Sequence, residues 1–222
     1  MNLDKLKEWF NRYIQAVIAP FKKWFEKEVK EPRVEEPYFQ YINKLWPARG
    51  GKDYDVRTFI FPCDLIMQRA LLTHDLKSEE GNDHTAFKCM RWVQNNIRYI
   101  GDKQAEKTSE YWKYPVDTYY SRQGDCEDNA ILLASLLINA GISEDRIRVC
   151  CGIAHYNSGG EFGHAYVIYK REKDDEWVQL DTNTIHKTNR VEQRKLFCND
   201  KLYDEPWFAF NSKYCTSGEG YK

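Results

Sequence analysis

A cysteine at the start of an apolar run is the residue of this chain best placed for covalent chemistry. Cys126 follows Gly124 and Asp125 directly and opens a strongly apolar segment, which predicts a buried helix. Free backbone N–H groups and the dipole at a helix N-terminus stabilise an anion, and the thiolate is the reactive form of cysteine. We therefore expect Cys126 to be a nucleophile with a lowered pKa. The alternative is a buried structural cysteine.

His164 and Asp181 are the expected partners of this thiol. A thiol nucleophile needs a group that takes its proton and later returns one to the leaving group, and histidine does both near neutral pH. His164 opens one alternating run and Asp181 closes the next. A hairpin with a two-residue turn at Glu172 and Lys173 puts them opposite each other, so that Asp181 can hold the imidazole. A four-residue turn would bring Asn183 opposite His164 instead, and this alternative stays open.

Three acidic residues, Asp125, Glu127 and Asp128, surround the thiol. We favour a role in capping the helix and complementing its dipole. The alternative is that a pair of these carboxylates ligates calcium, a hard cation that prefers oxygen.

The oxyanion of an acyl-transfer reaction needs N–H donors close to the nucleophile. The backbone N–H of Cys126 is the first candidate. A second donor could come from one of three side chains: Gln123, Tyr120 or Trp112.

The elements that position these groups follow from hydrophobic periodicity. Helical spacing predicts helices over 63–72, 84–97 and 126–140, the last ending at Gly141. Alternating patterns predict antiparallel strands over 146–154, 164–170 and 176–180. The aromatic stretch 101–124 is expected to be a loop that walls a cleft, and the tail 191–222 shows no pattern that assigns it.

Residues 1–37 are expected to form an amphipathic helix and a linker, with the catalytic domain over 38–222. Apolar side chains recur at helical spacing from Leu3 to Val29, Pro20 should kink or divide that helix, and 30–37 is charged and contains proline. The helix combines Trp and Phe with Lys, as interfacial helices do. We favour packing of 1–30 on its own domain or on a protein partner over contact with a membrane.

Composition excludes some classes of partner. A formal net charge of -1 and a pI near 6.5 remove the basic surface that nucleic-acid binding requires, so no nucleic-acid partner is expected. The seven cysteines are odd in number and form no CxxC pair, which favours free thiols in a reducing compartment. The opening residues lack the apolar core of a secretory signal, and we expect a cytoplasmic protein.

Three sequence blocks, GDCEDNAILLASLL, GHAYVIYK and EWVQLDTN, resemble the signature of the transglutaminase-like superfamily. The resemblance covers 92–183, and the spacing of Cys126, His164 and Asp181 is most similar to that of the bacterial transglutaminase-like cysteine proteinases. It implies an α+β, papain-like core with the nucleophile at a helix N-terminus packed on an antiparallel sheet, here with an added N-terminal helix. It also implies a Cys-His-Asp triad and, in some exported relatives, calcium held at positions matching Asp125 and Glu127.

The leading hypothesis is a cysteine hydrolase that cleaves a peptide, isopeptide or related amide bond of a protein or peptide substrate through a thioester acyl-enzyme. One alternative is acyl transfer from glutamine to an amine, which crosslinks proteins. Another is a non-catalytic docking protein that uses this fold and its N-terminal helix. No cofactor is expected to be required, with calcium at Asp125 and Glu127 as the alternative.

Overall fold

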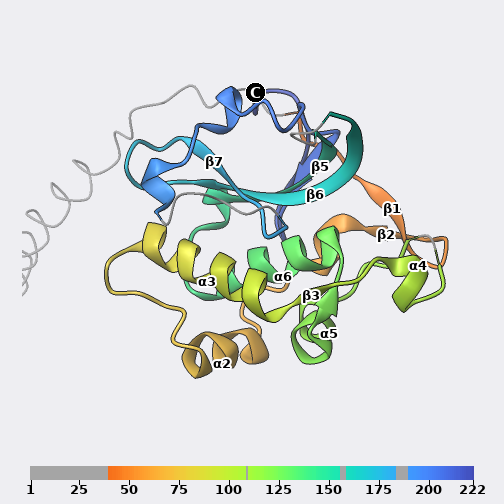
Figure 1. The fold of residues 1–222 in the computed structure, drawn as a ribbon, viewed down its shortest axis with the longest axis horizontal. Helices are drawn as coiled ribbons and strands as arrows, with labels where there is room; N and C mark the ends of the chain where they lie inside the picture. Colours follow the sequence, from red (N-terminus) through yellow and green to blue (C-terminus); the bar gives the residue numbers. More distant parts are fainter. Residues whose placement is uncertain (1–39, 109, 156–158, 184–189) are drawn as a thin grey trace, which may run out of the picture. The chain divides into compact units, whose positions relative to one another are not determined.

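The computed structural model describes residues 40–108, 110–155, 159–183 and 190–222. The predicted helix and linker at 1–37 lie outside the described residues, so the proposed division of the chain at residue 37 stays a prediction. In the described part, helices cover one face of an antiparallel sheet (Figure 1). The predicted α+β core, with its helices packed on an antiparallel sheet, is confirmed.

The sheet has five strands in the order β7-β6-β5-β8-β9, with every neighbouring pair antiparallel. Its strands are β5 (Ile147–His155), β6 (Glu161–Lys170), β7 (Trp177–Leu180), β8 (Phe208–Phe210) and β9 (Cys215–Ser217). The first three match the predicted strands. The other two come from the tail, which the sequence pattern left unassigned.

The register between β6 and β7 differs from the expected one. Val167 lies opposite Leu180, and the backbone N–H of Arg171 donates to the carbonyl of Glu176, which leaves a turn of four residues, 172–175. The predicted two-residue turn was wrong. The shift amounts to two positions, and side chains alternate with period two along a strand, so the same side chains still share a face.

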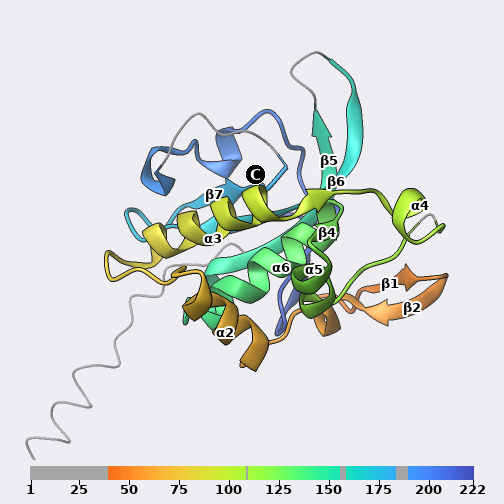
Figure 2. The same ribbon diagram turned by 60° about the horizontal axis from the view of Figure 1, so that its bottom comes forward.

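The helices form the second layer, with α6 (Cys126–Asn139) at its centre (Figure 2). This helix is apolar on all sides and contacts β5 and β6 of the sheet as well as α2 (Leu65–Thr73), α3 (Asn82–Asn96) and α5 (Pro115–Ser121). It ends before Gly141, whose φ of 97° suits glycine. None of the helices in the described residues is both long and apolar enough to span a membrane.

The stretch 101–124 is more ordered than the predicted loop. It holds α4 (Asp102–Ala105), α5 and the strand β4 (Gln123–Gly124), which pairs in parallel with β3 (Arg98–Tyr99). Pro115 begins α5, at the helix position where a missing N–H costs nothing.

A hairpin of β1 (Leu45–Arg49) and β2 (Lys52–Asp55) turns at Gly50 and Gly51, which have φ of 60° and 78°. Short 3-10 helices complete the described fold: Val56–Phe59, Glu144–Arg146, Val191–Gln193 and Phe197–Asn199.

Candidate active site

The N-terminus of α6 meets β5 and β6 at a cavity of about 350 Å³. The cavity is lined by aromatic, acidic and thiol side chains and by part of β6: Trp46, Glu110, Trp112, Cys126, Glu127, Cys151, Gly163, His164, Ala165 and Trp207. Two of the predicted site residues, Cys126 and His164, therefore share one cavity although 38 residues separate them in the chain.

Asp181 holds the imidazole of His164 from behind the cavity. His164 Nε2 and Asp181 Oδ2 are 2.8 Å apart and both side chains are buried. Asp181 also accepts from the hydroxyl of Tyr203 and from the backbone N–H of Asn183, each at 2.8 Å. Burial alone would raise the pKa of Asp181, but these bonds, led by that from His164, lower it below its usual value. The carboxylate is therefore charged, and it engages Nε2 of His164 rather than Nδ1.

Asp181 reaches His164 in spite of the changed register. The observed register, continued past the end of β7, puts Asn183 directly opposite His164, as a four-residue turn predicts. Asp181 is then the diagonal neighbour of His164 on the same face of the sheet. Asp181 lies one residue beyond the end of β7, and Asn183 contributes its backbone N–H to Asp181. The expected pair is thus brought together by a geometry other than the expected one.

The thiol of Cys126 lies at the start of α6, in the cavity that Ala165 of β6 also lines. Cys126 Sγ donates to Glu127 Oε2 at 3.2 Å. Burial, followed by the charge of Glu127, raises the pKa of Cys126 well above its usual value. This direction is opposite to the expected one, because a helix N-terminus contributes only about 0.3–2 kcal/mol, less than the loss of hydration next to acidic groups. These neighbours favour the protonated form of the thiol.

Asp102, Asp125 and Glu127 form an acidic cluster beside the thiol, with ligand atoms all within 4.8 Å of one another. Burial and then the charge of Asp125 raise the pKa of Asp102 to about 7. Asp102 Oδ1 and Asp125 Oδ1 are buried without a hydrogen-bond partner among the described residues. Asp125 occupies the N-cap position of α6, but its carboxylate accepts nothing from the helix N–H groups. The predicted capping role of Asp125 was therefore wrong, because its side chain turns toward Asp102.

Asp128 has a different partner, the buried Lys113. The backbone N–H and the Nζ of Lys113 lie 2.7 Å and 3.0 Å from the two carboxylate oxygens of Asp128. Lys113 Nζ also lies 3.4 Å from Glu106. Asp128 therefore ties the segment that carries Trp112 to α6 rather than capping the helix.

The candidates for a second oxyanion donor separate clearly. Trp112 lines the cavity, whereas Tyr120 is 67% exposed, and neither Tyr120 nor Gln123 lines the cavity. The indole N–H of Trp112 donates to Glu110 at 2.6 Å and is therefore engaged. The backbone N–H of Cys126 belongs to the first turn of α6, where no intrahelical acceptor exists.

Several residues of the site carried no local signal in the sequence. Tyr203 lies in the unassigned tail, and Asp102, Glu110 and Lys113 lie in the stretch predicted as a loop. Asp102 and Lys113 reach the site through hydrogen bonds to Asp125 and Asp128 at the start of α6, and Glu110 lies next to Tyr111, which pairs with Arg49 of β1. Tyr203 reaches it because it pairs with Ala154 of β5.

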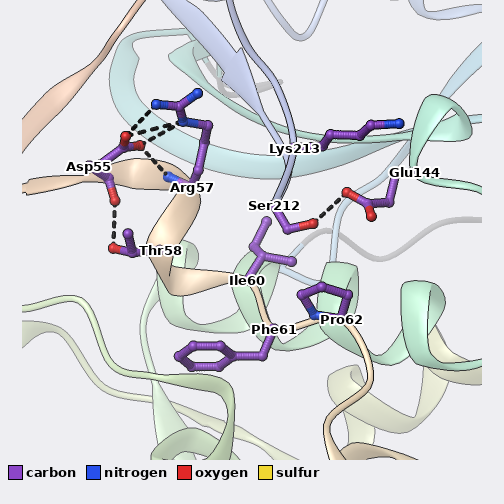
Figure 3. Close-up of a pocket in the computed structure, with 9 residues that line it drawn as sticks. All are labelled: Asp55, Arg57, Thr58, Ile60, Phe61, Pro62, Glu144, Ser212 and Lys213. Carbon is purple, nitrogen blue, oxygen red and sulfur yellow. Dashed lines mark hydrogen bonds and ion pairs between the residues drawn. The ribbon is translucent and has the colours of Figure 1, made fainter.

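A larger hollow of about 580 Å³ lies elsewhere on the molecule (Figure 3). It contains the ion pair of Arg57 with Asp55 and a hydrogen bond from Ser212 to Glu144. The described residues that line it include neither a cysteine nor a histidine. The candidate nucleophile and base therefore line the smaller cavity at α6 and not this hollow.

Comparison with known proteins relates this fold to others. The family model of the transglutaminase-like domain matches residues 68–188, more than half of the 222 residues. No curated protein matches the chain in sequence.

Solved structures resemble the described fold. LapG of Legionella pneumophila, EGTA-treated, has a TM-score of 0.52 at 17% identity, over 72% of this chain and 87% of LapG, which shows a shared fold. Calcium-bound LapG has a TM-score of 0.44 at 18% identity, over 68% and 86% of the two chains. A candidate cysteine protease of Cytophaga hutchinsonii has a TM-score of 0.39 at 23% identity, over 59% of this chain and 43% of that protein's chain.

Proposed function

The chain belongs to the transglutaminase-like domain family, and from this membership and the site we propose that it is a cysteine hydrolase of peptide, isopeptide or related amide bonds in a protein or peptide substrate. One observation supports this proposal most directly. Cys126 and His164 line one cavity, and His164 is held by the buried carboxylate of Asp181 at 2.8 Å. Together these three side chains provide a nucleophile, a base and a group that orients the base.

The reaction begins from a neutral thiol. His164 Nδ1 accepts the Cys126 proton as the sulfur attacks the carbonyl carbon of the substrate, and the carbonyl oxygen becomes an oxyanion near the backbone N–H of Cys126. The imidazolium then gives its proton to the leaving nitrogen, the C–N bond breaks, and a thioester remains on Cys126. Water attacks the thioester with His164 as base, the C–S bond breaks, and the carboxylic acid and the thiol are released.

Asp181 keeps the imidazole productive throughout this cycle. Its charged oxygen accepts Nε2–H, which fixes the tautomer in which Nδ1 can accept the thiol proton and stabilises the imidazolium when it forms. The hydroxyl of Tyr203 holds the same oxygen from the far side, so Asp181 has little freedom to turn away.

We further propose that calcium binds at Asp102, Asp125 and Glu127. Three carboxylates within 4.8 Å, two of them with a buried oxygen that lacks a partner in the described part of the chain, suit a hard cation that prefers oxygen ligands. Such an ion supplies positive charge beside Cys126. It would offset the repulsion among carboxylates that are otherwise buried together.

The proposal is tested by turnover of a fluorogenic peptide library with the full chain and its variants. Cys126→Ala should abolish cleavage, and mass spectrometry should detect an acyl group on Cys126 of the parent protein. Cys198→Ala, at an exposed cysteine outside the cavity, is the matched control and should keep full activity. Cleavage that survives Cys126→Ala would overturn the proposal. Incorporation of a labelled amine in place of hydrolysis would assign the alternative, acyl transfer.

A further inference from the structure

Glu110 stands in the wall of the cavity in an unusual setting. The indole N–H groups of Trp46 and Trp112 both donate to Glu110 Oε1, at 2.8 Å and 2.6 Å. Indole N–H groups only donate, so the carboxyl group must accept at this oxygen. Oε2 makes no hydrogen bond or ion pair within the described residues. The two rings therefore fix a carboxylate whose second oxygen is available to a ligand.

The segment that carries Glu110 is anchored by the two residues that follow it. The backbone N–H of Trp112 donates to the carbonyl of Ala48 at 2.7 Å, and Arg49 pairs with Tyr111. Glu110 is thus placed by β1 and by the indoles, and its position does not depend on a substrate.

The surroundings of Glu110 suit a cation and oppose an anion. The described residues that line the cavity include no lysine or arginine, and Glu110 is the lining acid that the proposed calcium site does not use. Trp207, at the same cavity, is 53% exposed and offers an aromatic face. Lys44 Nζ, which lies outside the lining, is 5.2 Å from the ring centroid of Trp46, so this indole attracts a cation of the chain itself.

We propose that Glu110 is a specificity determinant that selects substrates with a lysine or arginine side chain close to the scissile bond. The inference rests on the proposed hydrolase function. The Glu110 carboxylate pairs with the cationic side chain while an aromatic wall covers its methylene groups, and acidic side chains are repelled.

The test measures how fast Cys126 is alkylated by three small reagents of different charge, with peptide mapping to follow this one thiol. The reagents are 2-bromoethylamine, iodoacetamide and iodoacetate, which are cationic, neutral and anionic. Glu110→Gln keeps an oxygen acceptor for both indoles and removes the charge. Relative to the parent protein, it should slow the cationic reagent about fivefold, leave the neutral one within twofold and speed the anionic one about fivefold.

Glu161→Gln makes the same change on β6 at an exposed site outside the cavity and should alter none of the three rates. If Glu110→Gln leaves all three rates unchanged, or changes them alike, Glu110 only supports the indoles and the proposal is wrong.

A second measurement uses peptides that differ only in lysine, norleucine or glutamate beside the cleaved bond. The parent protein should prefer lysine over norleucine about tenfold in kcat/KM, and Glu110→Gln should reduce the ratio of the two rates to within about twofold of one. Equal rates for lysine and norleucine in the parent protein would overturn the selection and leave hydrolysis intact. Alkylation needs no turnover, so a charge signature without any Cys126-dependent cleavage would instead reject the hydrolase proposal.

Discussion

At the scale of single residues, the site depends on how a buried charge is satisfied. Asp181 is fully buried, and burial of an unpaired carboxylate is costly. The described structure offers it three donors, His164, Tyr203 and the backbone N–H of Asn183. The same bonds that stabilise the charge also orient the imidazole, so stability and the proposed activity are coupled at this residue.

Tyr203→Phe removes one of these donors and leaves the buried Asp181 carboxylate with one hydrogen bond fewer. We expect a loss of about 1–2 kcal/mol in the free energy of unfolding and a fall of about tenfold in kcat/KM. Urea denaturation and peptide turnover measure the two effects. Tyr166→Phe is the matched control, because the buried Tyr166 hydroxyl, in the same aromatic cluster, has no hydrogen-bond partner in the described residues. A similar loss in both variants would contradict the role assigned to Tyr203.

Asp181→Asn should change the pH dependence of stability. The folded-state pKa of Asp181 is lowered, so its charge contributes stability above the unfolded pKa of about 3.9, and that contribution is lost as pH falls through the folded pKa. At pH 6 the variant should be about 2 kcal/mol less stable than the parent protein. The difference should shrink below pH 4. A difference that stays constant from pH 6 to pH 3 in urea titrations would show that Asp181 is not charged in the folded protein.

At the scale of elements, the tail places a cavity wall by a close backbone contact. The chain at Pro206 passes between Gly152 on β5 and Gly218 after β9, and Trp207 follows it directly to the cavity. The backbone N–H of Trp207 donates to the carbonyl of Cys151 at 2.8 Å. Two positions without side chains therefore let the tail lie against the sheet at this point.

Gly218→Ala should be severely destabilising. A methyl carbon there would lie 1.5 Å from the carbonyl oxygen of Pro206, so the backbone before Trp207 would have to move. We expect a loss of about 3 kcal/mol and reduced turnover at temperatures where the variant stays folded. Gly101→Ala is the control, since a methyl group there meets nothing within 4 Å and φ is -70°. Calorimetry should find that control within about 0.5 kcal/mol of the parent protein.

At the scale of the whole molecule, the acidic cluster links α4 to the start of α6 by groups that repel one another. A ligand that binds only the folded state stabilises it by mass action, by about 2.7 kcal/mol at a hundredfold excess over Kd. The proposed calcium should act on global stability through this cluster.

Calcium at a concentration about a hundredfold above its Kd should raise the Tm of the full chain by about 5–10 °C, and magnesium should raise it by less. Asp102→Asn should abolish the shift, because it removes one of the three carboxylates that are proposed to bind calcium. Asp102 is not part of the proposed triad. Asp53→Asn, outside the cluster, should keep it. Thermal denaturation with EDTA or with added calcium measures the effect, and an unchanged Tm in the parent protein would reject the calcium site.

Sequence patterns predicted the elements that carry the proposed nucleophile and base. Short-range periodicity and turn residues predict the apolar helix from Cys126 and the three strands near His164 and Asp181. The structure has these elements at the predicted positions to within a few residues. The side of the strand on which His164 and Asp181 meet was also predictable, because a register change of two residues preserves it.

Only the tertiary structure decided what surrounds these residues. The pKa of Cys126 is raised because burial and a neighbouring acid outweigh the helix N-terminus, and burial is a property of the packed chain. Tyr203, Asp102 and Glu110 reach the site from segments without periodicity, through pairing with β5, α6 and β1. Local patterns encode the elements, whereas the contacts between distant segments depend on how those elements pack together.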